Sequence, residues 1–176
     1  AAYGVDPSQL VLPSWGGAEM YQGPEDNVLA WLIAYNAINF SYWSVPGTGA
    51  WWTEVGGEPV GRDDPALGVM AALGRALRQG VRLGDGAFLS GLTLPDLEVI
   101  LRPAPGAHPL PMMDVRLASL RELGRAYIRV GGPRVILRSA GGSALRMVHW
   151  LATECPRWDD ARMWRGRRLR FLKRAQ

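Results

Sequence analysis

Helix-start and helix-stop residues recur along this chain at spacings that leave room only for short helices. In "DDPALGVMAALGRALRQG", residues 63–80, Asp64 is an expected N-cap, Pro65 suits the first helical position and Gly80 ends the helix. These residues act locally, because a carboxylate accepts from free backbone N–H groups, proline already has a helical φ and glycine tolerates a left-handed one. The pattern predicts a chain built mainly from helices of moderate length.

Similar start and stop signals predict the other elements. Helices are expected at residues 27–43 (with an aromatic exit), 93–102 (with a Thr93 cap), 113–130 (ending at Gly-Gly), 143–154 (before a proline) and from about Leu169 onward. Residues 103–111 form a proline-rich connector, and "WWTEVGGEPVG", residues 51–61, predicts a hairpin that turns at Gly56 and Gly57. We therefore expect a mainly α fold with one small β-hairpin, forming a single helical domain over residues 1–176.

Composition limits the class of protein. With 176 residues and 48% hydrophobic content, the chain can bury one core. Its longest apolar run, residues 28–34, is too short to cross a bilayer, and nothing resembles a signal peptide. The single cysteine, Cys155, excludes an internal disulfide and favours a reducing compartment. We expect a soluble, cytoplasmic protein without membrane contact, in which Cys155 is a small buried hydrophobe and not a nucleophile.

The net charge of +4 is concentrated at the C-terminal end of the chain. Residues 157–176 hold eight Arg or Lys and only two Asp, so the remainder is slightly acidic. Such a basic block suggests an anionic partner: a nucleic acid or the phosphate of a nucleotide. The alternative is a solvated face, or one whose charges are paired within the protein.

Polar and aromatic side chains continue an apolar line on the first expected helix. The line at i, i+3, i+4, i+7 spacing contains Leu29, Leu32, Ile33, Asn36, Asn39, Phe40 and Trp43. Two amides would then point toward the core, and a buried amide group without a partner costs about 1–3 kcal/mol. Either other side chains satisfy Asn36 and Asn39, or they face a pocket. Amides beside flat rings suit a heterocyclic base.

Other chemistry-bearing residues carry weaker signals. Two histidines and one cysteine give no zinc spacing, and no glycine-rich phosphate loop is present. His149 lies within a turn of two apolar residues, which favours a structural role over a catalytic one. Asp160 and its neighbour Asp159 either pair with nearby arginines or read a base edge or a diol. Asp114 is a further candidate, because it follows the proline-rich connector where the chain turns into a helix.

The segments "NAINFSYW", residues 36–43, and "GRRLRFLKRAQ", residues 166–176, are two of six that, in order, resemble the queuosine salvage family, long known as a domain of unknown function. The aromatic segment "NAINFSYW" is similar to the family's "LNFSFW"-like stretch, and "GRRLRFLKRAQ" to its "GKRV-FYKRAQ" stretch. No single match is decisive, but together they cover residues 27–176. The six segments are residues 36–43, 71–80, 99–102, 111–125, 141–160 and 166–176.

The resemblance implies an enzyme, an N-glycosidase that hydrolyses queuosine 5'-monophosphate and releases queuine for reuse in tRNA. It also implies a helical fold distantly like helix-hairpin-helix DNA glycosylases, with no metal and no organic cofactor. The expected partner is this small nucleotide, without a stable nucleic-acid partner.

The family's substrate suggests roles for individual residues. Queuine is a 7-deazaguanine with a charged arm that bears a diol. Phe40 and Trp43 could stack on its ring, Asn39 could bond a polar edge, and Asp114 or Asp160 could meet donors. For the 5'-phosphate the candidate cations are Lys173 or Arg174, with Arg146 or His149 as alternatives.

The chain departs from the family pattern at its end. In the family, "KRAQ" is followed by a segment like "ILVAD" and roughly a further hundred residues, and the expected catalytic aspartate lies there. We therefore expect the 176 residues to be part of a larger glycosidase domain that continues past Gln176, and to be inactive alone. The alternative from another class is a non-catalytic nucleic-acid-binding helical module, with the basic block on phosphates and aromatic rings on bases.

Overall fold

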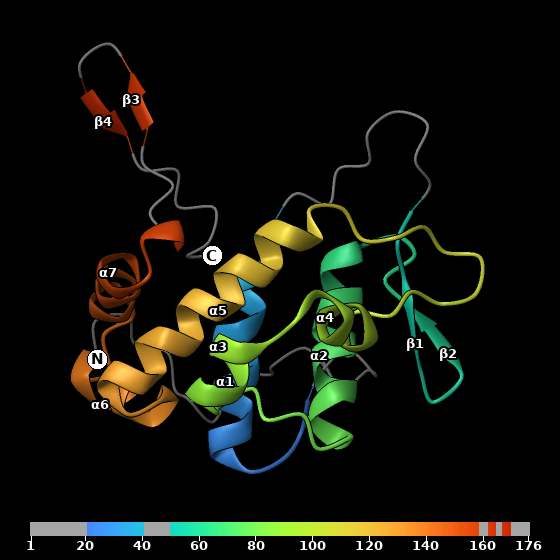
Figure 1. Ribbon diagram of the computed structural model, residues 1–176, viewed down its shortest axis with the longest axis horizontal. Helices are drawn as coiled ribbons and strands as arrows, with labels where there is room; N and C mark the ends of the chain where they lie inside the picture. The colour runs from blue at the N-terminus through green and yellow to red at the C-terminus, as the bar shows by residue number, and fades with distance from the viewer. Residues whose placement is uncertain (1–20, 41–49, 159–161, 165–166, 170–176) are drawn as a thin grey trace, which may run out of the picture.

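The computed structural model describes residues 21–40, 50–158, 162–164 and 167–169, and within these ranges the protein is mainly helical (Figure 1). The helices are α1 (Glu25–Ile38), α2 (Pro65–Arg78), α3 (Gly86–Gly91), α4 (Leu94–Ile100), α5 (Met113–Val130), α6 (Pro133–Ala140) and α7 (Ala144–Glu154), followed by the 3-10 turn η2 (Pro156–Trp158). The strands are β1 (Thr53–Val55), β2 (Glu58–Val60), β3 (Arg162–Trp164) and β4 (Arg167–Leu169). The expected mainly helical class is confirmed.

Helix α5 is the central element, and α1, α3, α4 and α6 all pack against it (Figure 1). Its contact with α3 is especially close because of two glycines. A Cβ on Gly124 would meet the backbone N of Ser90 and the backbone C of Leu89, and a Cβ on Gly86 would lie 2.8 Å from the carbonyl oxygen of Gly124. The two backbones can approach this closely only because neither glycine carries a side chain.

Helix α1 buries a different face from the predicted one. Its buried residues are Ala30, Trp31, Ile33, Ala34, Ala37 and Ile38. Leu32 is 38% exposed, and Asn36 is half-buried, with its amide Nδ2 donating to the carbonyl oxygen of Leu32 at 2.8 Å. The predicted line was therefore wrong at these positions. Alanines at the buried positions let α1 come close to its neighbours, and the Trp31 indole donates to the Met70 carbonyl oxygen at 2.9 Å.

The predicted punctuation is confirmed in the middle of the chain. The Asp64 side chain accepts from the Ala66 N–H at 2.9 Å, and Gly80 has a φ of +88° just after α2. Thr93 forms a capping box with Asp96 at the start of α4. The hydrogen bonds from Thr93 lower the pKa of the Asp96 carboxyl, since they favour its charged form.

The expected hairpin is present, and a second one was not expected. β1 and β2 pair antiparallel, with Thr53 opposite Val60, and turn at Gly56 (φ +63°) and Gly57 (φ +87°). β3 and β4 form a separate antiparallel pair. Leu169, the expected start of a last helix, is the final residue of β4, and the rest of that predicted helix lies outside the described residues.

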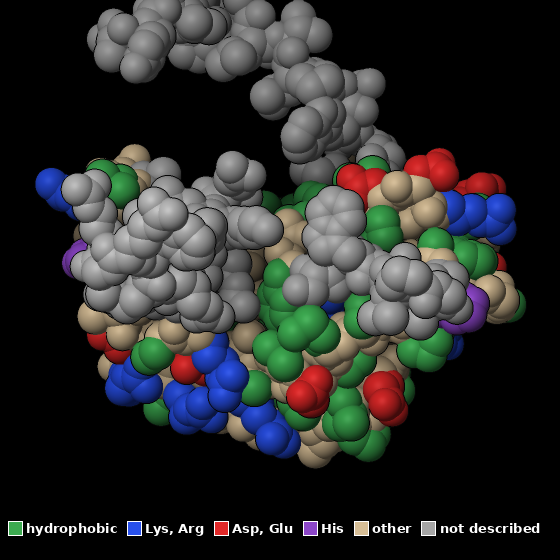
Figure 2. Space-filling view, turned by 90° about the horizontal axis from the view of Figure 1, so that it is seen from above, with side chains coloured by type: hydrophobic (Ala, Val, Ile, Leu, Met, Phe, Trp, Pro, Cys, Tyr) green, Lys and Arg blue, Asp and Glu red, His purple; other side chains and the backbone are tan. Residues whose placement is uncertain are grey.

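The surface mixes charge signs around apolar areas. On the face in Figure 2, hydrophobic side chains gather near the middle, Lys and Arg side chains cluster toward the lower left, and acidic and basic side chains are interspersed at the upper right. In the part of the chain that the structure describes, no helix has the length and apolar character needed to span a bilayer.

Candidate functional site

The exit of α1 brings together two of the predicted site residues. The helix ends at Ile38, Asn39 is its C-cap and the Phe40 N–H donates to the Ile38 carbonyl oxygen at 3.0 Å. Both Asn39 and Phe40 are half-buried. A half-buried ring and amide at a helix end can present one face to a ligand while the protein holds the other.

A buried arginine holds this exit in place. Arg116 of α5 is 0% exposed. Its guanidinium donates from Nη2 to the Phe40 carbonyl oxygen at 2.6 Å, and from Nη1 to the Ile38 carbonyl oxygen. The guanidinium carbon also lies 4.6 Å from the centroid of the Phe40 ring, which is a cation–π contact. Because a guanidinium is planar and has donors in fixed directions, Arg116 fixes both the backbone and the ring of Phe40.

The start of α5 is shaped to place that arginine. Arg116 Nε donates to the Pro111 carbonyl oxygen at 3.0 Å. Between them, Met112 is in the left-handed region (φ 57°, ψ 40°), where it is the sole non-glycine residue among those described. Such a conformation is unfavourable for a residue with a side chain and often occurs at functional sites. The side chain of Met112 is 44% exposed. The strained turn lies beside the exit of α1.

The structure separates the remaining described candidates. Asp114 is exposed in the first turn of α5, two residues from Arg116, so the two side chains leave the helix on different sides. His149 is exposed on α7. That helix packs near the other end of α5, where Arg129 Nη2 bonds Glu154 Oε2 at 2.9 Å. Trp43, Asp160, Lys173 and Arg174 lie outside the described residues.

Arg116 was not predicted as a site residue, although its position in the helix pattern indicated that its side chain is buried. On the 113–130 helix, Arg116 lies four residues before Leu120 and seven before Leu123, both of which are fully buried. An arginine on the apolar line of a helix is buried only when oxygen acceptors surround it. The position therefore indicated a buried cation with carbonyl partners, but the sequence could not say which carbonyls.

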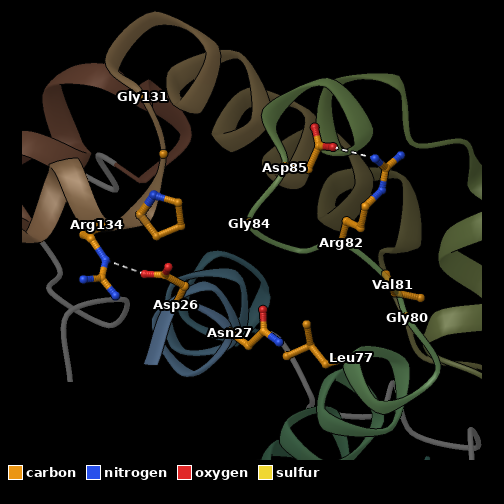
Figure 3. A pocket seen from close by; sticks show the side chains of 12 residues that line it. Asp26, Asn27, Leu77, Gly80, Val81, Arg82, Gly84, Asp85, Gly131 and Arg134 are labelled. Carbon is orange, nitrogen blue, oxygen red and sulfur yellow. Dashed lines mark hydrogen bonds and ion pairs between the residues drawn. The ribbon is translucent and has the colours of Figure 1, made fainter. Parts of the chain in front are cut away.

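A cavity of about 420 Å³ lies elsewhere, between the start of α1, the α2–α3 loop and the α5–α6 turn (Figure 3). Each of the two arginines that line this cavity forms an ion pair with an aspartate. Arg134 Nε bonds Asp26 Oδ1 at 2.6 Å, and Arg82 Nη1 bonds Asp85 Oδ2 at 3.0 Å. The hydrogen bond to Asp26 raises the pKa of Arg134, and backbone N–H donors lower the pKa of Asp85. None of the predicted site residues lines this cavity. The Arg134–Asp26 ion pair joins α6 to α1, and the Arg82–Asp85 pair lies within the α2–α3 loop.

Cys155 lies in the core, as predicted. Its side chain is 0% exposed, and burial raises the pKa of its thiol to about 12. Over the described ranges, no three His, Cys, Asp or Glu side chains are grouped so that they could hold a metal ion.

The buried thiol gives a direct prediction. Because both burial and the raised pKa suppress the thiolate, native protein at pH 8 should react with a thiol reagent at least about 100-fold more slowly than unfolded protein. The measurement is the time course of thiol labelling with and without denaturant. Rapid labelling of the native protein would show that Cys155 is accessible and contradict its place in the core.

The described fold and site define a mainly helical protein whose aromatic helix exit is fixed by a buried arginine. Residues 20–176 match the queuosine salvage protein family, and the chain belongs to that family. The predicted family resemblance is thereby confirmed.

Curated relatives cover most of the chain. A protein of Sphaerobacter thermophilus, named queuosine 5'-phosphate N-glycosylase/hydrolase, is 29% identical over 170 residues, which is 96% of this chain and 50% of the relative. Proteins with the same name are 26% identical in Mus musculus (88% of this chain, 45% of the relative) and 25% identical in Schizosaccharomyces pombe (92% and 49%). The chain spans about half the length of the curated relatives it matches.

Proposed function

We propose that this chain supplies part of the site of an N-glycosidase that hydrolyses queuosine 5'-monophosphate and releases queuine. Family membership and the names of the relatives support the reaction class. The observation that carries the proposal is the exit of α1, where Arg116 fixes the ring and backbone of Phe40 beside the half-buried Asn39. Arg116 is a positioning residue here, because its known bonds go to protein carbonyl groups.

The chemistry of the substrate assigns roles to these residues. Phe40 and Trp43 would stack on the 7-deazaguanine ring, since every heterocyclic base offers a flat face to an aromatic side chain. Asn39 would bond the polar edge of the ring, and Asp114 or Asp160 would accept from the amine and diol of the arm. Stacking and edge contacts together hold the base in one orientation.

The sugar and phosphate need other groups. Breaking the glycosidic bond builds positive charge on the ribose, so a carboxylate must stabilise that charge and direct water to the anomeric carbon. We place this aspartate beyond Gln176, in a larger glycosidase domain of which this chain is a part. Lys173 or Arg174 would meet the 5'-phosphate. His149 and Arg146 have less support, because α7 packs near the end of α5 away from Phe40.

Three further features of the proposed enzyme remain predictions. A likeness to helix-hairpin-helix DNA glycosylases remains a prediction about the fold. A cytoplasmic location remains a prediction from the single cysteine. A reaction without metal or organic cofactor is also still a prediction, and adding a chelator to an active preparation tests it.

The reaction is tested by measuring queuine release from queuosine 5'-monophosphate. We expect release by a chain that continues beyond Gln176 and none by the 176 residues alone, because the proposal assigns the catalytic aspartate to the continuation. Release by neither chain, with both folded and substrate in excess, would contradict the proposal.

The two ring positions are tested in that longer chain. Phe40→Ala or Trp43→Ala should weaken substrate affinity by about 10–100-fold, because stacking contributes about 1–3 kcal/mol per base. The matched control is Phe88→Ala, which removes a half-buried ring on α3. The readout is the dissociation constant, with folding checked by circular dichroism. Unchanged affinity in both variants would reject the stacking role.

The alternative, a non-catalytic nucleic-acid-binding module, is not favoured, since the relatives are named for hydrolysis. Salt dependence separates the two. A module held by phosphate contacts would bind RNA with an affinity that falls steeply with salt. The proposed enzyme should show no stable RNA complex at any salt concentration.

A further inference from the structure

A second cavity, of about 340 Å³, lies between β1, the last turn of α2 and the connector after α4. It is lined by Glu54, Arg75, Arg102, Pro103, Ala104 and Pro105. The wall made by the connector is fixed, because the Ala104 N–H donates to the Trp52 carbonyl oxygen at 2.9 Å. Two prolines flank that bond and restrict the backbone further.

Arg75 is held rigidly at the edge of this cavity. Its Nη1 donates to Thr53 Oγ1 at 2.5 Å and to the Glu54 carbonyl oxygen at 2.8 Å, and its Nη2 donates to the Ile100 carbonyl oxygen at 3.1 Å. The Thr53 hydroxyl, which is fully buried, donates in turn to the Arg102 carbonyl oxygen at 2.9 Å. The network joins β1, α2 and the end of α4. Its hydrogen bonds hold these residues in place without a ligand, so the site is preorganised.

More cationic than acidic side chains lie near Arg75. Its hydrogen bonds go to a hydroxyl and to carbonyl groups, which carry no net charge. Burial lowers the pKa of Arg75, and the nearby Arg102 and Arg78 lower it further, while Glu54 alone opposes them. Within the described part of the chain, no ion pair is formed by any of these three arginines. The cavity at α5–α6 differs here, since each of its two arginines faces a carboxylate.

From this arrangement we propose that the cavity binds a phosphate group, either as inorganic phosphate or as part of a small phosphorylated molecule. Arg75 and Arg102 both line the cavity, and guanidinium groups match the oxygens of a phosphate well. The volume admits a phosphate with several waters, or a phosphate with an attached sugar. Phe40 does not line this cavity, so the inference is independent of the proposed glycosidase reaction.

The test is a titration with inorganic phosphate, followed through the backbone amide resonances of Thr53 and Ala104. A parallel titration with sodium chloride at matched ionic strength removes general screening from the comparison. We expect saturable shifts with phosphate and not with chloride. A titration with adenosine monophosphate distinguishes the sources: tighter binding than phosphate indicates a phosphorylated molecule, and equal or weaker binding indicates the free anion.

Two substitutions in the cavity lining should change phosphate affinity in opposite directions. Arg102→Gln should weaken phosphate binding about 10-fold or more, because it removes an exposed cation while leaving the Arg102 carbonyl in the network. Glu54→Gln should tighten binding, since it removes the opposing carboxylate. Arg138→Gln, which changes an exposed arginine in the last turn of α6, is the matched control and should leave affinity unchanged. Unsaturable shifts, or equal affinity in all three variants, would overturn the proposal.

Discussion

Replacing Arg116 with methionine should lower the free energy of unfolding by about 3 kcal/mol, because it removes the guanidinium donor from three carbonyl groups, of which only that of Ile38 keeps another donor, the Phe40 N–H. These are the carbonyls of Ile38, Phe40 and Pro111. Each was desolvated against a guanidinium that methionine cannot replace. The loss should be read from urea denaturation at constant pH, together with a weakened affinity for substrate in the longer chain.

Two companion variants separate the geometry of Arg116 from its charge. Arg125→Met changes an exposed arginine on the same helix and should alter stability by about 0.5 kcal/mol or less. Arg116→Lys keeps the charge but lacks the planar fork, so it should fall between wild type and Arg116→Met. Equal stability of Arg116→Met and Arg125→Met would contradict the view that Arg116 holds the exit of α1.

The second large effect is expected at Gly124, where an alanine should cost about 3 kcal/mol through overpacking. The added Cβ would lie 2.8 Å from both the backbone C and the Cβ of Leu89, and it would also meet the backbone N of Ser90. Backbone atoms of a helix cannot move aside as a side-chain end can. Helix α3 would have to shift along α5, and thermal and urea unfolding would both report the loss.

Gly91 supplies the matched control for that substitution. It is the last residue of α3, and a Cβ there would meet no atom within 4 Å. Gly91→Ala should therefore be neutral or stabilising by up to about 1 kcal/mol, because alanine reduces the freedom of the unfolded chain. Similar losses at Gly91 and Gly124 would indicate that glycine flexibility, and not the close approach of α3 to α5, explains both.

The helices that could be predicted from sequence are those with local signals at their ends. Asp64 and Pro65 start α2, the Thr93–Asp96 capping box starts α4, and Ser143 caps α7 by accepting from the Arg146 N–H. These caps depend on neighbouring residues in the chain, so the sequence contains the required information. The bounds of α5 were predicted for the same reason, since Gly131 ends that helix with a φ of +97°.

Elements that depend on distant contacts were missed or misplaced. Helix α3 has the sequence GAFLSG, whose glycines and serine disfavour a helix, and its packing on α5 stabilises it. Helix α6 is an exception: it was missed although its local signals were readable, with Pro133 at its first position and Gly141 after its end. Helix α1 is apolar on most sides, so periodicity could not choose which face is buried.

The candidate site was predictable only in part. The aromatic exit at Phe40 stood out because rings and amides followed a helix directly. The arginine that fixes Phe40 lies 76 residues further along the chain, and no local pattern links the two. The cavity at Arg75 was also missed, because its lining comes from a strand, a helix and a connector that are separated in sequence.

The most direct test of the account is the affinity of queuosine 5'-monophosphate for the chain continued beyond Gln176, measured calorimetrically in wild type and in Phe40→Ala. The account predicts saturable binding at one site by the wild type and an affinity lower by about 10-fold or more in the variant, with both proteins folded by circular dichroism. The same affinity in both proteins would contradict the claim that the exit of α1 forms the wall on which the base stacks.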